Sequence, residues 1–233
     1  MAPITFAHRG ARLLHSENTI PAFRAGLEAG ARGLETDAWL SSDGEVVLTH
    51  DVLVSGPLFG LWKLRVAHTS AARLARHGVP RLTDLFAELG HDYDLSIDVK
   101  DPAAAEPIID MVRRVGDPAR TWLCSPSLDQ LRTLRAGATD VRLVHSTIRR
   151  RLPDSLERHA ADVAAARVDA MNLHYSEWSK GLVVLFHRFD VLAFAWDVQE
   201  VRHLQAMLDL GIDAVYCDHV QRMVATVSEW SPG

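Results

Sequence analysis

Two acidic residues lie two positions apart in a segment rich in strand-forming residues. Glu35 and Asp37 belong to the run GLETDAW, residues 33–39. Residues two apart in a strand point to the same face, and like charges that lie side by side repel each other. Either that face is open to water or a positive group lies between the two carboxylates. A hard divalent cation, which takes oxygen ligands at about 2.0–2.6 Å, would be such a group.

Further ionisable residues stand at the ends of other strand-like runs. They are His8, Arg9, His50, Asp98 and Lys100. Asp98 and Lys100 are again two apart, so that a third carboxylate from a neighbouring strand could converge on the same cation. The two histidines could move protons. The arginine and the lysine could offset the charge of an anion such as a phosphodiester.

Each of these features has a simpler interpretation when it is taken alone. An acid-x-acid pair more often marks a solvated strand face, and a lone histidine at a strand end is more often a surface residue. What favours a site is that four chain segments place ionisable residues at the same predicted end of one fold. We therefore expect Glu35, Asp37 and Asp98 to hold a divalent metal ion, Mg²⁺ or Ca²⁺, with Mn²⁺ as an alternative.

The elements that must position these residues alternate regularly along the chain. Strand-like runs are predicted at 4–8, 33–39, 93–99, 121–125, 141–146, 169–175, 190–196 and 213–218. Amphipathic helices are predicted at 19–29, 82–89, 103–115, 127–136, 154–166, 177–187, 199–210 and 219–229. Eight such units in 233 residues favour an α/β fold, the (β/α)8 TIM barrel, whose usual length is about 250 residues. A doubly wound open sheet is the alternative, but no GxGxxG follows the first strand.

One extra strand and one excursion interrupt this alternation. The Asp43-Gly44 pair is a strong signal for a two-residue hairpin and predicts a short strand at 45–49, after the second barrel strand. Residues 52–80, which include Gly56-Pro57, are predicted to form a short excursion. No linker or shift in composition divides the chain, so residues 1–233 are interpreted as a single domain.

Composition excludes several classes of protein. The formal net charge of −5 gives no basic footprint for nucleic acid. No apolar run approaches the roughly 18 residues that a membrane span needs, so stable membrane insertion is not expected. The first residues do not resemble a secretory signal. Two cysteines without a CxxC motif favour a reduced, cytoplasmic compartment. The oligomeric state stays open.

Several motifs, in order, resemble the glycerophosphodiester phosphodiesterase family of TIM-barrel enzymes. They are HRG (8–10), ENTIPAF (17–23), GARGLETD (30–37), SDGEVVLTHD (42–51) and IDVK (97–100), with weaker likeness in VPRLTDLF (79–86), AWDVQE (195–200) and GIDAVYCDHV (211–220). The resemblance implies metal-dependent hydrolysis of small glycerophosphodiesters to glycerol 3-phosphate and an alcohol. It matches His8 and His50 to the acid/base pair, Arg9 and Lys100 to the phosphate, and Trp196 to the substrate pocket.

The sharpest departure from the family is Asp98, where the family usually carries Glu. Asp at this place is similar to the phospholipases D that include sphingomyelinases D, so a lysophospholipase D or sphingomyelinase D-like activity is the alternative. A catalytically inactive binding barrel is less favoured, because every expected position is occupied. The sequence leaves open whether water or a substrate hydroxyl attacks, and which histidine is the acid.

Other polar residues are given structural interpretations. Asn18 and Thr19 are predicted to be turn and capping residues. His145 and His174 end strands and are interpreted as equally consistent with contacting substrate or lying at the surface, whereas His159 is predicted at the surface.

Overall fold

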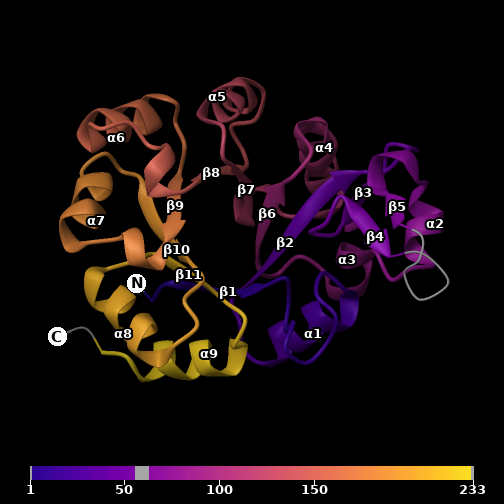
Figure 1. Cartoon of the computed structure of the whole chain (residues 1–233), viewed down its shortest axis with the longest axis horizontal. Coiled ribbons are helices and arrows are strands. Elements are labelled where there is room, and N and C mark those ends of the chain that lie inside the picture. Colours follow the sequence, from indigo (N-terminus) through magenta and orange to yellow (C-terminus); the bar gives the residue numbers. More distant parts are fainter. Residues whose placement is uncertain (1, 56–62, 232–233) are drawn as a thin grey trace.

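Eight parallel strands close into a ring in the computed structural model, which describes residues 2–55 and 63–231 (Figure 1). They are β1 (Ile4–His8), β2 (Gly33–Leu40), β6 (Asp94–Val99), β7 (Thr121–Ser125), β8 (Arg142–Ser146), β9 (Ala170–His174), β10 (Leu192–Trp196) and β11 (Ala214–Cys217). Each strand pairs with the next in parallel, and β1 closes the ring by pairing with both β2 and β11. The predicted TIM barrel is therefore confirmed.

A helix follows each barrel strand and packs on the outside of the ring (Figure 1). These helices are α1 (Ile20–Glu28), α3 (Leu82–Leu89), α4 (Ala105–Val115), α5 (Leu128–Gly137), α6 (Leu156–Ala165), α7 (Lys180–His187), α8 (Val201–Leu210) and α9 (Val220–Glu229). Thr19 is the N-cap of α1, as predicted, and its side chain accepts a hydrogen bond from the backbone N–H of Ala22. Ser127, Ser155 and Ser179 cap later helices in the same way.

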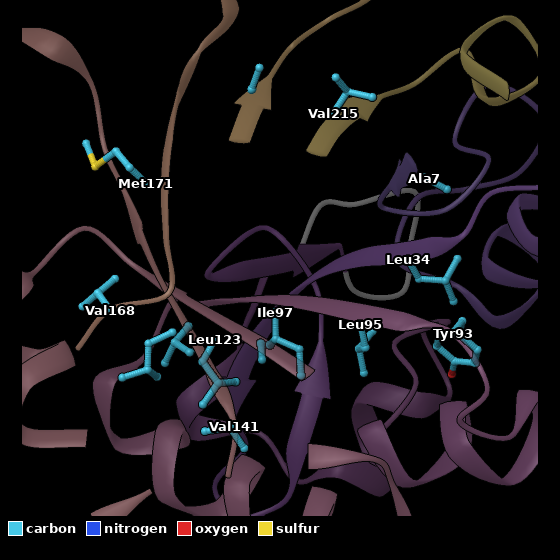
Figure 2. Close-up of a cluster of buried hydrophobic side chains, with 14 of the residues drawn as sticks. Ala7, Leu34, Tyr93, Leu95, Ile97, Leu123, Val141, Val168, Met171 and Val215 are labelled. Carbon is cyan, nitrogen blue, oxygen red and sulfur yellow. The ribbon is translucent and has the colours of Figure 1, made fainter. Parts of the chain in front are cut away.

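Two apolar cores hold the barrel. The outer core lies between the strands and the surrounding helices, and Figure 2 shows part of it, with Leu34, Ile97 and Leu123 among the buried side chains. The inner core fills the barrel and includes Phe6, which stacks on Tyr216 with ring centroids 4.8 Å apart. Successive strand residues point alternately into the inner and the outer core. Polar residues at positions that point inward therefore show where the barrel interior is a cavity and not apolar core.

The chain between β2 and α3 adds smaller elements at the side of the barrel. β3 (Val46–Leu48) pairs antiparallel with β2 outside the ring, which confirms the predicted hairpin strand. The predicted two-residue turn is wrong, because the register pairs Leu40 with Val46 and so makes the loop longer. β4 (Leu53–Ser55) and β5 (Lys63–Arg65) form a separate two-stranded sheet, followed by η1 (Val66–His68) and α2 (Ala71–Ala75). Strands of three residues are too short to show a hydrophobic period, which is why the sequence did not predict them. Gly56-Pro57, also assigned to the excursion, lies outside the described residues.

Four short 3₁₀ helices occupy other loops of the barrel. They are η2 (Pro102–Ala104), η3 (Pro118–Arg120), η4 (Arg149–Arg151) and η5 (Tyr175–Glu177). Of these, η2, η4 and η5 follow β6, β8 and β9 at the end of the barrel where the carboxyl ends of the strands lie. Within residues 2–55 and 63–231, none of the helices has both the length and the apolar character that crossing a membrane would require.

Candidate active site

A cavity of about 530 Å³ lies at the carboxyl ends of the barrel strands. All eight residues that the sequence predicts for the site line it: His8, Arg9, Glu35, Asp37, His50, Asp98, Lys100 and Trp196. The volume falls within the range of about 300–1,000 Å³ that is usual for small-molecule sites. The position is also the one at which TIM barrels carry their active sites.

Strand register explains why the polar residues from β1, β2 and β6 meet. Glu35 on β2 lies opposite His8 on β1, and Asp37 lies opposite Asp98 on β6. Side chains at one level of a parallel barrel point into it together. The acid-x-acid spacing therefore places two carboxylates in successive layers of the interior, where Glu35 and Asp37 are 7% and 1% exposed.

The turn after β1 depends on backbone conformations that favour glycine. Arg9 and Gly10 both have positive φ, 55° and 78°. A Cβ at Gly10 would lie 2.5 Å from the backbone carbonyl carbon of Ala22, so only glycine fits without a shift of α1. The turn directs the backbone N–H of Arg9 to Glu35 Oε2, at 2.9 Å. It also places the Arg9 guanidinium between Glu17, at 3.0 Å, and Asp37, at 3.2 Å.

Asp37 is the site carboxylate whose negative charge is balanced by the most neighbouring cationic and hydrogen-bonding groups. Its oxygens lie 3.1 Å from Lys100 Nζ and 3.2 Å from Arg9 Nε. Asn18 donates a further hydrogen bond to it through Nδ2, at 3.0 Å. Although burial would raise the pKa of Asp37, Lys100 and Arg9 hold that pKa below its ordinary value. Asp37 is therefore ionised at neutral pH.

Asn18 corrects the sequence prediction in part. Its backbone does occupy a left-handed turn position, with φ of 54°. Its side chain is buried, however, and joins Asp37 to Thr36, whose hydroxyl donates to Asn18 Oδ1 at 2.7 Å. Asn18 is thus a positioning residue for a site carboxylate as well as a turn residue.

The negative charge of Glu35 is not balanced by neighbouring groups to the same extent. The Arg9 backbone N–H donates to Oε2, and His8 Nε2 lies 3.8 Å from the same oxygen. Burial, together with the neighbouring Asp37, raises the pKa of Glu35 to about 7. This buried carboxylate would gain from a further positive charge nearby.

His8 is oriented by a carboxylate that the sequence prediction missed. His8 Nδ1 lies 2.6 Å from Oδ1 of Asp218, which directly follows β11, while Nε2 faces Glu35. Burial opposes protonation, but Glu35 and Asp218 raise the pKa of His8 above its ordinary value. The available signal was the position of Asp218 at the carboxyl end of the last barrel strand.

His50 approaches the cavity from the loop after β3 and is more exposed than His8. Its Nδ1 lies 2.9 Å from Asp51 Oδ1. Both histidines therefore have one ring nitrogen beside a carboxylate, an arrangement that fixes the orientation and tautomer of an imidazole.

The three predicted metal ligands line one cavity, but Lys100 lies between two of them. Its Nζ contacts both Asp37 and Asp98. Within the described part of the chain, no three Asp, Glu, His or Cys side chains are gathered closely enough to hold one ion. The donor chemistry, oxygen ligands that include the only partly compensated Glu35, fits a hard divalent cation. Binding to all three would require Lys100 to release at least one carboxylate.

The opposite wall of the cavity comes from β8, β9 and β10. Trp196 lies at the end of β10, where the His174 ring meets it edge-on with centroids 4.7 Å apart. His174 also contacts Asp197, at 3.2 Å. His174 therefore supports the wall of the cavity through Trp196 and Asp197.

His145 does not line the cavity, and His159 is not at the surface as predicted. The two rings pack together with centroids 5.2 Å apart, and each residue is 5% exposed. Because β8 residues alternate between interior and exterior, His145 faces α6 while the next residue, Ser146, faces the cavity.

Fold and cavity together define a barrel enzyme that gathers histidines, carboxylates and cationic side chains at one site. A model of the glycerophosphoryl diester phosphodiesterase family matches residues 8–222. The glycerophosphodiester phosphodiesterase of Caldanaerobacter subterraneus subsp. tengcongensis is 25% identical over 97% of this chain and 98% of its own. The chain therefore belongs to the glycerophosphoryl diester phosphodiesterase family, and it is a phosphodiesterase.

Solved structures agree with the barrel fold. The glycerophosphodiester phosphodiesterase of Thermotoga maritima superposes with a TM-score of 0.82 at 24% identity, covering 97% of this chain and 98% of that one. A phosphodiesterase of Oleispira antarctica, solved in complex with the product sn-glycerol-3-phosphate, superposes with a TM-score of 0.83 at 17% identity, covering 98% of both chains.

Proposed function

We propose that this enzyme hydrolyses glycerophosphodiesters to glycerol 3-phosphate and an alcohol. The observation that carries the proposal is the convergence of two histidines, two cationic side chains and three carboxylates on one cavity. The names of its relatives and the product bound to the Oleispira antarctica enzyme support the same substrate class.

Glu35, Asp37 and Asp98 are the residues that would hold a divalent cation. When bound, such a cation supplies Lewis-acid stabilisation of charge on a phosphate oxygen. The raised pKa of Glu35 supports this assignment, because a buried carboxylate whose charge is only partly balanced is stabilised by a further positive charge nearby. Once Lys100 releases a carboxylate, its ammonium group becomes available to the substrate phosphate.

His8 and His50 supply the proton transfers. One of them takes a proton from the attacking oxygen, and the other gives a proton to the leaving alkoxide. Asp218 and Asp51 hold the two rings in position through Nδ1, which leaves Nε2 of each ring for the substrate. Arg9 and Lys100 offset the charge that develops on the phosphoryl oxygens.

Kinetics of histidine variants test this assignment. We expect His8→Ala and His50→Ala each to lose at least about a hundredfold in kcat on glycerophosphoethanolamine, whose alkoxide leaving group needs a proton; this is the low end for an acid or base. His91→Ala is the matched control, because His91 is exposed and does not line the cavity. Near-wild-type turnover by either site variant, in a protein that melts like the wild type, would remove that histidine from the mechanism.

Calorimetric titration of Mg²⁺ tests the ligand set. Asp98→Asn should weaken binding strongly, whereas Asp98→Glu should weaken it much less, because the longer carboxylate still reaches the ion. If Asp98 only partners Lys100, all three proteins will bind Mg²⁺ with equal affinity, and the three-carboxylate site is wrong.

A further inference from the structure

The cavity has a second half that the proposed chemistry does not use. The catalytic residues lie on β1, β2, β6 and the loop after β3, whereas β8, β9 and the loop after β8 provide the facing wall. Ser146 and Asn172 lie on that wall, and Arg151 lies above them on η4. Because Arg9 and Lys100 would hold the phosphate on the first half, one alcohol part of the diester must extend over the second.

Asn172 lines this half of the cavity and carries a buried polar atom without a partner in the part of the chain that the structure describes. The residue is 5% exposed, and its Nδ2 donates to Ser146 Oγ at 3.1 Å. Its Oδ1 is buried and has no hydrogen-bond partner among the described residues. A buried acceptor without a donor has lost its hydrogen bonds to water and gained none from the protein. A ligand that brings an N–H or O–H group to this oxygen would restore a hydrogen bond.

Arg151 brings a positive charge, without an ion-pair partner in the described ranges, to this half of the cavity. Three consecutive arginines, Arg149, Arg150 and Arg151, form η4, and Arg151 is the one that lines the cavity. Among the described residues, no carboxylate lies within ion-pair distance of the Arg151 guanidinium. Asp197 also lines this wall, but its carboxylate contacts His174 and accepts a hydrogen bond from Gln199.

These two features fit the head group of the diester better than its glycerol. Glycerol carries hydroxyl donors but no charge, so it would leave Arg151 without a partner. A quaternary ammonium head group, as in glycerophosphocholine, offers no N–H donor to Asn172 and carries a charge of the same sign as Arg151.

We propose that Asn172 and Arg151 form a head-group subsite that selects head groups carrying both a carboxylate and an N–H or O–H donor, such as the zwitterionic head group of glycerophosphoserine. Asn172 Oδ1 accepts a hydrogen bond from the ammonium or hydroxyl group, and the Arg151 guanidinium pairs with the carboxylate. This inference rests on the proposed glycerophosphodiesterase function and adds a substrate preference to it.

Three substrates allow the contribution of the Arg151 contact to be measured separately from that of the Asn172 contact. Glycerophosphoserine differs from glycerophosphoethanolamine by one carboxylate, and glycerophosphoethanolamine differs from glycerophosphocholine by its N–H donors. We expect Arg151→Gln to lower the ratio of kcat/KM for the serine diester over the ethanolamine diester about tenfold, the loss expected for one charge-assisted contact. Arg151→Lys should keep most of that ratio.

Arg150→Gln is the matched control, because Arg150 lies on the same 3₁₀ helix and does not line the cavity. It should leave the serine-to-ethanolamine ratio unchanged. Equal ratios for wild type, Arg151→Gln and Arg150→Gln would overturn the role of Arg151, as would an equal fall in both glutamine variants.

Asn172→Leu should lower the ethanolamine-to-choline ratio about fivefold, and Asn172→Asp, which keeps an acceptor oxygen, should preserve it. An unchanged ratio in Asn172→Leu would overturn the role of Asn172. Because burial makes the leucine variant prone to unfold, its melting temperature is measured alongside, and the aspartate variant supplies a second test. Its added charge should selectively weaken the serine diester.

The affinities of glycerophosphoserine and glycerophosphoethanolamine, measured by calorimetry, test the head-group subsite independently of the proposed hydrolysis. If the wild type cleaves none of the three diesters, the proposed function fails, and the binding ratio alone decides the subsite. Tighter binding of the serine diester that is lost in Arg151→Gln supports the subsite. Equal binding of both diesters by the wild type contradicts it.

Discussion

The contact between His8 and Asp218 makes a prediction whose size follows from the structure. Asp218 Oδ1 lies 2.6 Å from His8 Nδ1, and its side chain is only 25% exposed. Asp218→Asn keeps the shape but removes the charge, and its amide can donate to Nδ1 and so hold the opposite tautomer. A hydrogen bond to a charged group contributes about 1.5–3 kcal/mol, which corresponds to roughly 10–150-fold in rate.

We therefore expect Asp218→Asn to lower kcat on glycerophosphoethanolamine by about 10–150-fold while KM changes little, because Asp218 acts through His8. Asp213→Asn is the control. Asp213 Oδ2 lies 2.7 Å from His187 Nε2, a similar contact made by residues outside the cavity lining. This control should retain wild-type kcat.

Turnover of Asp218→Asn within twofold of the wild type, in a protein with the same melting temperature, would refute the positioning role. A rise in KM at constant kcat would point instead to a contact between Asp218 and the substrate.

Three further predictions concern the metal, the fold at low pH and the turn after β1. Exhaustive treatment with EDTA should abolish diesterase activity, and Mg²⁺, Mn²⁺ or Ca²⁺ should restore it; full activity after chelation would remove the metal. Burial, together with His159, lowers the pKa of His145 from 6.5 to about 4, so stability is complete above pH 6.5 and falls by up to about 3 kcal/mol as pH drops towards 4. His145→Gln should flatten that fall in urea unfolding at a series of pH values, and a profile parallel to the wild type would contradict the assignment. Gly10→Ala should lower the melting temperature by several degrees and reduce activity, because its Cβ would overlap the backbone of Ala22; unchanged melting would show that the turn adapts.

The barrel was predictable because each unit carries a strong local signal. Buried strands separated by amphipathic helices repeat eight times. The Asp43-Gly44 pair in addition indicates a hairpin, and so predicts β3. The side chains that face the cavity could be predicted from the same logic, since a strand end in a barrel defines a level and a face. Period-two alternation places Glu35 and Asp37 on one face, and the barrel prediction makes that face, with Asp98 from the neighbouring strand, the interior.

What the sequence did not show depends on contacts between distant segments. Asp218 reaches His8 only because β11 closes the ring against β1, and nothing local distinguishes it from a helix-capping carboxylate. Asn18 has the composition of a turn residue, and its bond to Asp37 appears only when α1 packs beside β2. Whether His145 points into or out of the barrel depends on the exact register of β8, because a shift by one residue would exchange the two faces.

The most direct test of the account is a ³¹P NMR time course of glycerophosphoethanolamine hydrolysis by the wild type and by His8→Ala, in the presence of Mg²⁺. We predict that in the wild-type reaction the diester signal is replaced by the signal of glycerol 3-phosphate, with one ethanolamine released per phosphate. With His8→Ala, the half-life of the diester should be at least about a hundredfold longer. An unchanged diester with the wild type, or phosphoethanolamine and glycerol as products, would contradict it.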